Sequence, residues 1–114
     1  MSALRRVSLA IPVFNEQEVI PELLRRITAV LDALPGGPHE VVFVNDGSRD
    51  RTLELLKAAA ALDARLRVVS FSRNFGHQAA LSAALEHSTG DVVLTMDADL
   101  QDTPEVLPDL LRRL

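Results

Sequence analysis

The chain has 114 residues, no cysteine and a net charge of −4. Its length suffices for one domain with a core of its own. The acidic balance argues against a nucleic-acid partner, because no basic face is present to neutralise a phosphate backbone. The lack of cysteine excludes disulfides and thiolate metal sites, and no apolar run reaches the ~18 residues that a membrane span needs. We therefore expect a soluble, cytoplasmic domain.

In the first half of the chain, segments whose apolar residues have the spacing of a strand alternate with segments that have the spacing of a helix. A branched apolar run over 7–13 predicts a strand, and apolar residues at helical spacing over about 19–34 predict a helix that ends at a Pro-Gly-Gly-Pro turn. A second strand is expected over 40–45. Asp50 is expected to cap a second helix over about 51–62.

The second half repeats this alternation. It predicts a third strand over 67–71, an alanine-rich helix over about 77–87, a fourth strand from about 92 and a last helix that Pro104 opens. Four such units predict an α/β fold. We expect a Rossmann-like, doubly wound parallel sheet of about four strands, with helices on both faces.

Polar residues stand at all four positions where the strands should end. The carboxyl ends of parallel strands meet at one rim of a sheet, and ligands of such folds bind there. The four ends carry Asn15-Glu16, Asn45-Asp46-Gly47-Ser48, the segment 72–77, and Asp97-Ala98-Asp99-Leu100-Gln101. The sequence therefore predicts one shared cleft.

The fourth end carries two carboxylates one residue apart. In extended backbone Asp97 and Asp99 project to the same side. Two close anions repel each other, so the pair favours a divalent cation, or a diphosphate held through one. The alternative is an acidic turn ahead of the last helix, which Asp102 and Glu105 would cap. His39 and His87 flank predicted elements and are expected at the surface.

The common phosphate-binding motifs are absent. No Gly-x-Gly-x-x-Gly follows the first strand, and no Gly-Lys-Ser/Thr occurs anywhere in the chain. Phosphate groups would then be met by a metal ion and by Arg73 or backbone amides.

Four segments resemble the motifs of family 2 glycosyltransferases of the GT-A fold. They are residues 11–16 (IPVFNE), 44–50 (VNDGSRD), 73–80 (RNFGHQAA) and 97–102 (DADLQD). The chain is most similar to the branch that moves a sugar from a nucleotide onto a polyprenyl phosphate, typified by dolichol-phosphate mannose synthase and bactoprenol glucosyltransferases. It departs from that pattern at Asn45, where many members have Asp, and at Thr103, where many have Pro.

The resemblance implies a role for each motif. The implied nucleotide-sugar-binding residues are Pro12, Phe14, Asn15, Glu16, Asp46, Arg73, Gly76, His77, Asp97 and Ala98. Asp46 would hydrogen-bond the base or ribose, and Arg73 would approach the diphosphate. Phe14 would stack on the base unless it belongs to the core, and His77 either contributes to the site or only begins a helix. Asp99 and Gln101 would be the protein ligands of Mg²⁺ or Mn²⁺.

The resemblance also implies the reaction. The donor would be a UDP- or GDP-sugar, and the acceptor a polyprenyl phosphate or another cell-envelope glycan, with inversion at the anomeric carbon. No residue is an obvious catalytic base, and the reaction would not need one, because a polyprenyl phosphate is already anionic at neutral pH. Relatives continue into further strands, so residues 1–114 would be a single donor-binding domain that is truncated relative to the family. The lipid acceptor would bring this cytoplasmic domain to the inner face of the membrane. An exposed sheet edge would then favour homo-oligomers.

Two other functions stay open. The chain is alternatively a nucleotide-sugar-binding or assembly module without turnover. A phosphate-transfer domain with Asp97 as nucleophile fits less well. A receiver needs an acid at the end of the third strand and a later lysine, whereas Ser72 stands there and Lys57 is the only lysine. A dehalogenase-type phosphatase needs its Asp-x-Asp after the first strand.

Overall fold

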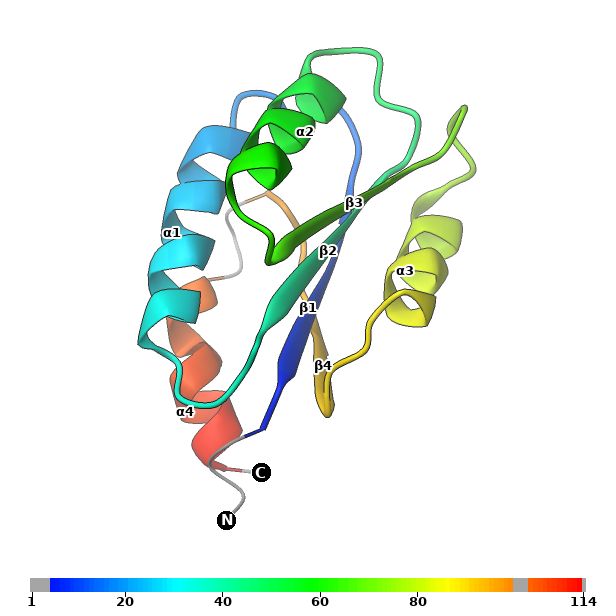
Figure 1. Ribbon diagram of the computed structural model, residues 1–114. Helices are drawn as coiled ribbons and strands as arrows, with labels where there is room; N and C mark the ends of the chain where they lie inside the picture. The colour runs from blue at the N-terminus through cyan, green and yellow to red at the C-terminus, as the bar shows by residue number, and fades with distance from the viewer. Residues whose placement is uncertain (1–4, 100–102, 114) are drawn as a thin grey trace.

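The computed structural model describes residues 5–99 and 103–113, which form a sheet covered by helices on both faces (Figure 1). In this part of the chain four parallel strands lie in the order β3-β2-β1-β4. The strands are β1 (Val7–Val13), β2 (Glu40–Asn45), β3 (Leu66–Ser70) and β4 (Val92–Thr95). The predicted α/β fold with a parallel sheet is confirmed.

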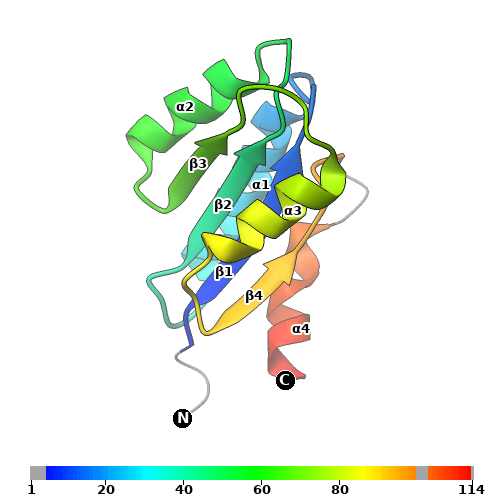
Figure 2. The same cartoon turned by 90° about the vertical axis from the view of Figure 1, so that its right-hand side faces the viewer.

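The helices divide between the two faces of the sheet. The elements are α1 (Ile20–Ala33), α2 (Thr52–Leu62), α3 (His77–Glu86), the 3-10 turn η2 (Pro104–Val106) and α4 (Leu107–Arg112). Figures 1 and 2 show α1, α2 and α4 on one face and α3 on the other. None of the helices in the described ranges is long and apolar enough to cross a membrane.

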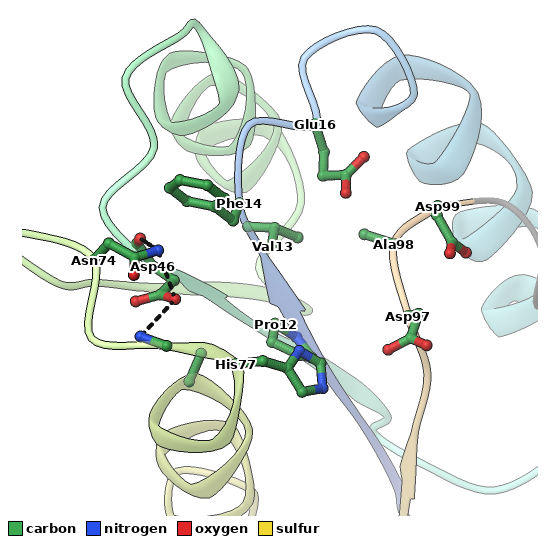
Figure 3. Close-up of a pocket in the computed structure, with 12 residues that line it drawn as sticks. Pro12, Val13, Phe14, Glu16, Asp46, Asn74, His77, Asp97, Ala98 and Asp99 are labelled. Carbon is green, nitrogen blue, oxygen red and sulfur yellow. Dashed lines mark hydrogen bonds between the residues drawn. The ribbon is translucent and has the colours of Figure 1, made fainter.

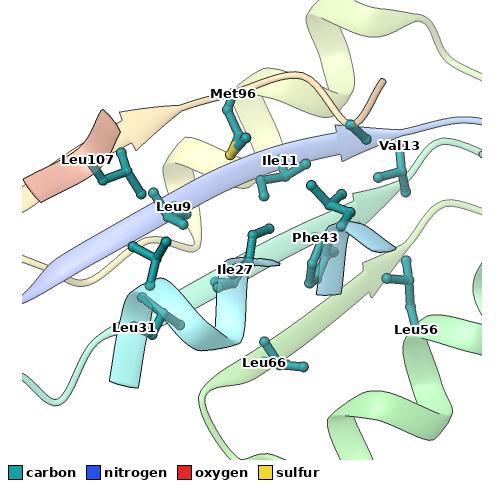
Figure 4. Close-up of a cluster of buried hydrophobic side chains, with 14 of the residues drawn as sticks. Leu9, Ile11, Val13, Ile27, Leu31, Phe43, Leu56, Leu66, Met96 and Leu107 are labelled. Atoms are coloured by element: carbon teal, nitrogen blue, oxygen red, sulfur yellow. The ribbon is translucent and has the colours of Figure 1, made fainter. Parts of the chain in front are cut away.

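The larger core lies between the sheet and the helices α1, α2 and α4. Alternate residues of β1, which include Leu9 and Ile11, meet Ile27 of α1, and Phe43 of β2 lies fully buried beside them (Figure 4). All residues of β1 and β2 are buried. Burial on both faces explains why these strands are near-continuous apolar runs without alternation.

The opposite face is covered by α3 alone among the described helices. Ala80 and Ala84 of α3 pack on Ala10 and Val42 of the two central strands. Because alanine has a short side chain, this helix lies close to the sheet. Its first residue, His77, stands at the carboxyl rim.

Two sequence predictions about polar residues are wrong. His39 is buried, because its Nδ1 accepts the Val7 N–H at 3.1 Å while its Nε2 lies 3.1 Å from the Pro35 carbonyl oxygen. A peptide N–H only donates and a carbonyl only accepts, so both bonds require a neutral ring that carries its hydrogen on Nε2. Glu105 does not cap a helix but pairs with Arg26 of α1 at 2.6 Å. Asp102 lies outside the described residues, and His87 is exposed as predicted.

A buried carboxylate ties three strands together at the amino end of the sheet. Glu40 is 8% exposed and accepts hydrogen bonds from the Ser8 hydroxyl at 2.6 Å, the Thr89 N–H at 2.6 Å and Arg67 at 3.0 Å. Burial raises the pKa of Glu40, but these hydrogen bonds together outweigh it and lower the pKa to about 2. The ionised form is therefore the one that stabilises the fold.

Glu40→Gln should lower the free energy of unfolding by about 3 kcal/mol near neutral pH, since a pKa unit is worth about 1.4 kcal/mol. The folded pKa of about 2 lies below the reference value of 4.5, so the stabilisation is complete above pH 4.5 and is lost as the pH falls toward 2. Urea unfolding followed by circular dichroism over this range measures the difference. Glu54→Gln, at an exposed position of α2, is the control. A wild-type advantage that stays constant with pH would contradict this account.

Candidate functional site

A cavity of about 440 Å³ opens at the carboxyl rim of the sheet, between the ends of β1, β2 and β4 and the start of α3 (Figure 3). It is lined by Pro12, Val13, Phe14, Glu16, Asp46, Asn74, Gly76, His77, Ala80, Asp97, Ala98 and Asp99. The structure thus brings most of the predicted site residues to one place. Gln101 lies outside the described residues.

The loop after β1 is shaped by its own hydrogen bonds. Asn15 has a positive φ of 51°, which asparagine tolerates better than most residues. Its N–H donates to the Ser48 hydroxyl at 2.9 Å, and its side-chain oxygen accepts the Arg49 N–H at 2.8 Å. Asn15 therefore fixes the loop that carries Phe14 and Glu16, and it does not line the cavity.

Phe14 stands between two hollows of the rim and does not belong to the core. Its side chain is 42% exposed. A second hollow of about 600 Å³ shares Phe14 and Asn74 with the first cavity, and Asn15, Ser48 and Arg73 are among its other lining residues. This resolves the alternative left by the sequence in favour of a surface position.

Arg73 lies in the second hollow. Its guanidinium carbon is 4.5 Å from the centre of the Phe75 ring, a distance typical of a cation–π contact. Arg73 is not among the residues that line the first cavity. Its contact with a diphosphate stays a prediction.

The side of the cavity next to β4 is acidic. Glu16, Asp97 and Asp99 lie on this side, across the cavity from Asn74 and His77 (Figure 3). Burial raises the pKa of Glu16, and the negative charge of Asp99 raises it further. Glu16 and Asp99 are thus close enough to repel each other.

Oxygen donors of this kind suit a hard divalent cation. Within residues 5–99 and 103–113, no three acidic or histidine side chains gather closely enough to hold a metal by themselves. A cation at Asp99 would therefore need further oxygens from a ligand, water or a residue outside these ranges. Mg²⁺ commonly binds in this way, with one or two carboxylates and the phosphates of a substrate.

The helix α3 presents its amino end to the opposite side of the cavity. Its first residue is His77, and the preceding Gly76 has a φ of 102°, a conformation that favours glycine. A Cβ atom built at Gly76 would meet no atom within 4 Å. A ligand can therefore approach this backbone closely, and the positive end of the helix dipole favours an anion there.

Asp46 is held by protein donors. It is 3% exposed, and its Oδ1 accepts the Phe75 N–H at 2.7 Å. Its Oδ2 accepts the Gly76 N–H at 3.1 Å and the Asn74 side-chain amide at 3.1 Å (Figure 3). The sequence suggests a ligand contact for Asp46 and gives no sign of these three bonds.

Asn74, Val13 and Ala80 line the cavity although the sequence analysis does not single them out. Asn74 stands inside the segment 73–80 that resembles a family motif, but no distinct chemistry marks it. Ala80 lies one helical turn after Gly76 and its N–H bonds to the Gly76 carbonyl. Its place in the first turn of α3 is the signal that could have identified it.

Comparison with known proteins agrees with this geometry. A curated undecaprenyl-phosphate 4-deoxy-4-formamido-L-arabinose transferase of Pseudomonas paraeruginosa is 52% identical over 108 residues, which are 94% of this chain and 32% of that protein. The chain spans about a third of the length of the curated relatives it matches.

Two solved structures share the fold. The mannosyltransferase PcManGT of Pyrobaculum calidifontis, in complex with GDP-Man and Mn²⁺, has a TM-score of 0.74 at 33% identity, over 83% of this chain and 28% of that one. S. aureus TarS 1-349 in complex with UDP has a TM-score of 0.77 at 29% identity, over 94% of this chain and 31% of that one.

The match to a family model also spans nearly the whole chain. The profile of the family described as "Glycosyl transferase family 2" covers residues 8–114, from β1 to the end of the chain, and includes all residues of the cavity. On this match the chain belongs to glycosyl transferase family 2.

Proposed function

We propose that this chain binds the nucleotide-sugar donor of a glycosyltransferase. The observation that carries the proposal is the shared rim, where an acid pair after β4 faces the amino end of α3 across a cavity of about 440 Å³. A nucleoside diphosphate is an anion that both sides can hold, one through a cation and the other through the helix dipole. The solved neighbours with GDP-Man and with UDP support a UDP- or GDP-sugar.

The donor would lie across the rim. Phe14 offers an exposed aromatic face for a base, and the open backbone at Gly76 can approach the phosphates. Asp99, with Gln101, would hold Mg²⁺ or Mn²⁺, and the Mn²⁺ in the PcManGT complex supports this choice. When bound, the cation would offset the charge of the departing nucleoside diphosphate.

The acceptor of the complete protein would be a polyprenyl phosphate. The curated relative named for undecaprenyl phosphate supports this class. A phosphate oxygen of the lipid would attack the anomeric carbon as the bond from that carbon to the diphosphate breaks. The nucleoside diphosphate leaves, and the configuration at the anomeric carbon is inverted. The attacking oxygen is already anionic, so the step needs no base. Such a lipid would place the protein at the inner face of the membrane.

The Asp99→Asn variant should weaken nucleotide binding in the presence of Mn²⁺ by about tenfold or more, because a carboxylate is a far better ligand of a hard cation than an amide. Calorimetric titration with UDP, GDP and their sugars, with and without Mn²⁺, measures this and also identifies the base. The matched control is Asp32→Asn, at an exposed position of α1.

Equal losses in Asp99→Asn and Asp32→Asn would contradict the metal assignment. Wild-type protein that binds none of these nucleotides would contradict the proposed function. A chain that binds them with Mn²⁺, while the complete protein never transfers or hydrolyses the sugar, would favour a binding module without turnover.

We propose in addition that a second copy of the chain pairs along β4. In the described part of the chain β4 ends the sheet on one side, and Val93 of β4 is 37% exposed. An edge strand offers unpaired N–H and carbonyl groups to another strand. Light scattering should show a mass that rises with concentration for the wild type and stays monomeric for Val93→Lys. A monomer at all concentrations would overturn this proposal.

A further inference from the structure

We propose that Asp46 is a positioning residue that holds the loop between β3 and α3 in shape before any ligand binds. This loop, residues 71–76, is called the arch below. The expected effect on nucleotide affinity rests on the proposed function. The order of the arch can be tested in the chain without any ligand.

The first argument is the set of partners around the Asp46 carboxylate. The Phe75 and Gly76 N–H groups and the Asn74 amide all donate to it, at 2.7, 3.1 and 3.1 Å. The Asn74 amide also lies 3.2 Å from the Asp46 main-chain oxygen. Every one of these partners belongs to the arch. Charge-assisted hydrogen bonds to backbone N–H groups are among the stronger ones in proteins.

The second argument is independent of the carboxylate. Gly47 has a φ of 72°, and a Cβ atom built on it would lie 2.3 Å from the carbonyl carbon of Arg73 and 2.4 Å from the nitrogen of Asn74. The turn after β2 and the arch therefore touch backbone to backbone. Only glycine permits this approach, so the carboxylate of the preceding residue reaches the arch N–H groups.

The arch has internal contacts that link its first residues to its last. The rings of Phe71 and Phe75 meet edge to face, with centres 5.5 Å apart, and Arg73 lies over the Phe75 ring. The arch also carries Asn74, which lines both hollows of the rim. By fixing the arch, Asp46 fixes the wall between the hollows and the chain that enters α3.

The position needs a carboxylate because all three partners of its side chain are hydrogen-bond donors, and a carboxylate only accepts. In Asp46→Asn, one oxygen is replaced by an NH₂ group, which would point a donor at a donor and lose one or more of the three bonds. If Asp46 served only as a ligand contact, the same substitution would leave the arch of the ligand-free chain unchanged.

Amide hydrogen exchange of the ligand-free chain separates these possibilities. Asp46→Asn should speed exchange at the Phe75 and Gly76 N–H groups by about tenfold or more, while the amides of β1 and β2 keep their protection. Asp32→Asn is the matched control and should leave both sets unchanged. Unchanged exchange at Phe75 and Gly76 would overturn the proposal.

A milder variant keeps the test valid if Asp46→Asn fails to fold. Asn74→Ala removes only one of the three donors, and it should raise exchange at the same two amides by a smaller factor. No rise at these amides in a folded Asn74→Ala chain would overturn the proposal in the same way.

Titration with UDP and GDP in the presence of Mn²⁺ then links the arch to the donor site. In Asp46→Asn, affinity should fall by about the factor by which the ordered arch is depopulated. Lost affinity with an unperturbed arch would overturn the positioning role and indicate direct contact. Wild-type protein with a protected arch and no nucleotide binding would overturn the proposed function alone.

Discussion

The direction of the strands is the constraint on which the site depends. Val13 pairs with Asn45 and Asn45 with Ser70, while Ala10 of β1 pairs with Thr95 of β4. Because all four strands run the same way, the loops that follow them emerge on one rim. Burial of β1 and β2 on both faces fixes their register, since a slip by one residue would exchange the residues of the two cores. The side chains of the cavity are therefore positioned by the packing of the sheet, although the loops that carry them are irregular.

The strand β2 has a buried carboxylate at each end, and the two differ in what they hold. Glu40 at the amino end is bound by Ser8, Thr89 and Arg67, which belong to other strands or to a turn. Asp46, just after the carboxyl end, is bound by the arch. Both acids accept hydrogen bonds from backbone N–H groups, that of Thr89 in the case of Glu40 and those of Phe75 and Gly76 in the case of Asp46. Burial of an acid is thus no sign of function by itself. Asp46 differs from Glu40 because it lies at the carboxyl rim of the sheet, where the cavity opens.

The periodicity of the sequence predicts the elements well because the information is local. The strand over 7–13 has the predicted bounds, and α1 covers Ile20–Ala33 within the expected range of about 19–34. Partners far apart in the sequence are not predictable in this way. His39 is buried through a bond to Val7, 32 positions away, and Glu105 meets Arg26 over 79 positions. The acids of the site are predicted from the strand ends, whereas the three bonds of Asp46 arise from how two loops meet, which no single segment encodes.

If the arch is ordered before a ligand binds, the ligand does not have to offset the entropy cost of ordering it. A binding site that is already in shape avoids the entropy cost of ordering a loop when the ligand arrives, so more of the contact energy appears as affinity. If Asp46 instead turned to a ligand, the Phe75 and Gly76 N–H groups would lose their acceptor at the moment of binding. The nucleoside would have to replace those bonds with its own. On the proposed function, Asp46 would keep its three partners and hold the arch, while Asp97 and Asp99 would receive the phosphates of the donor through a cation.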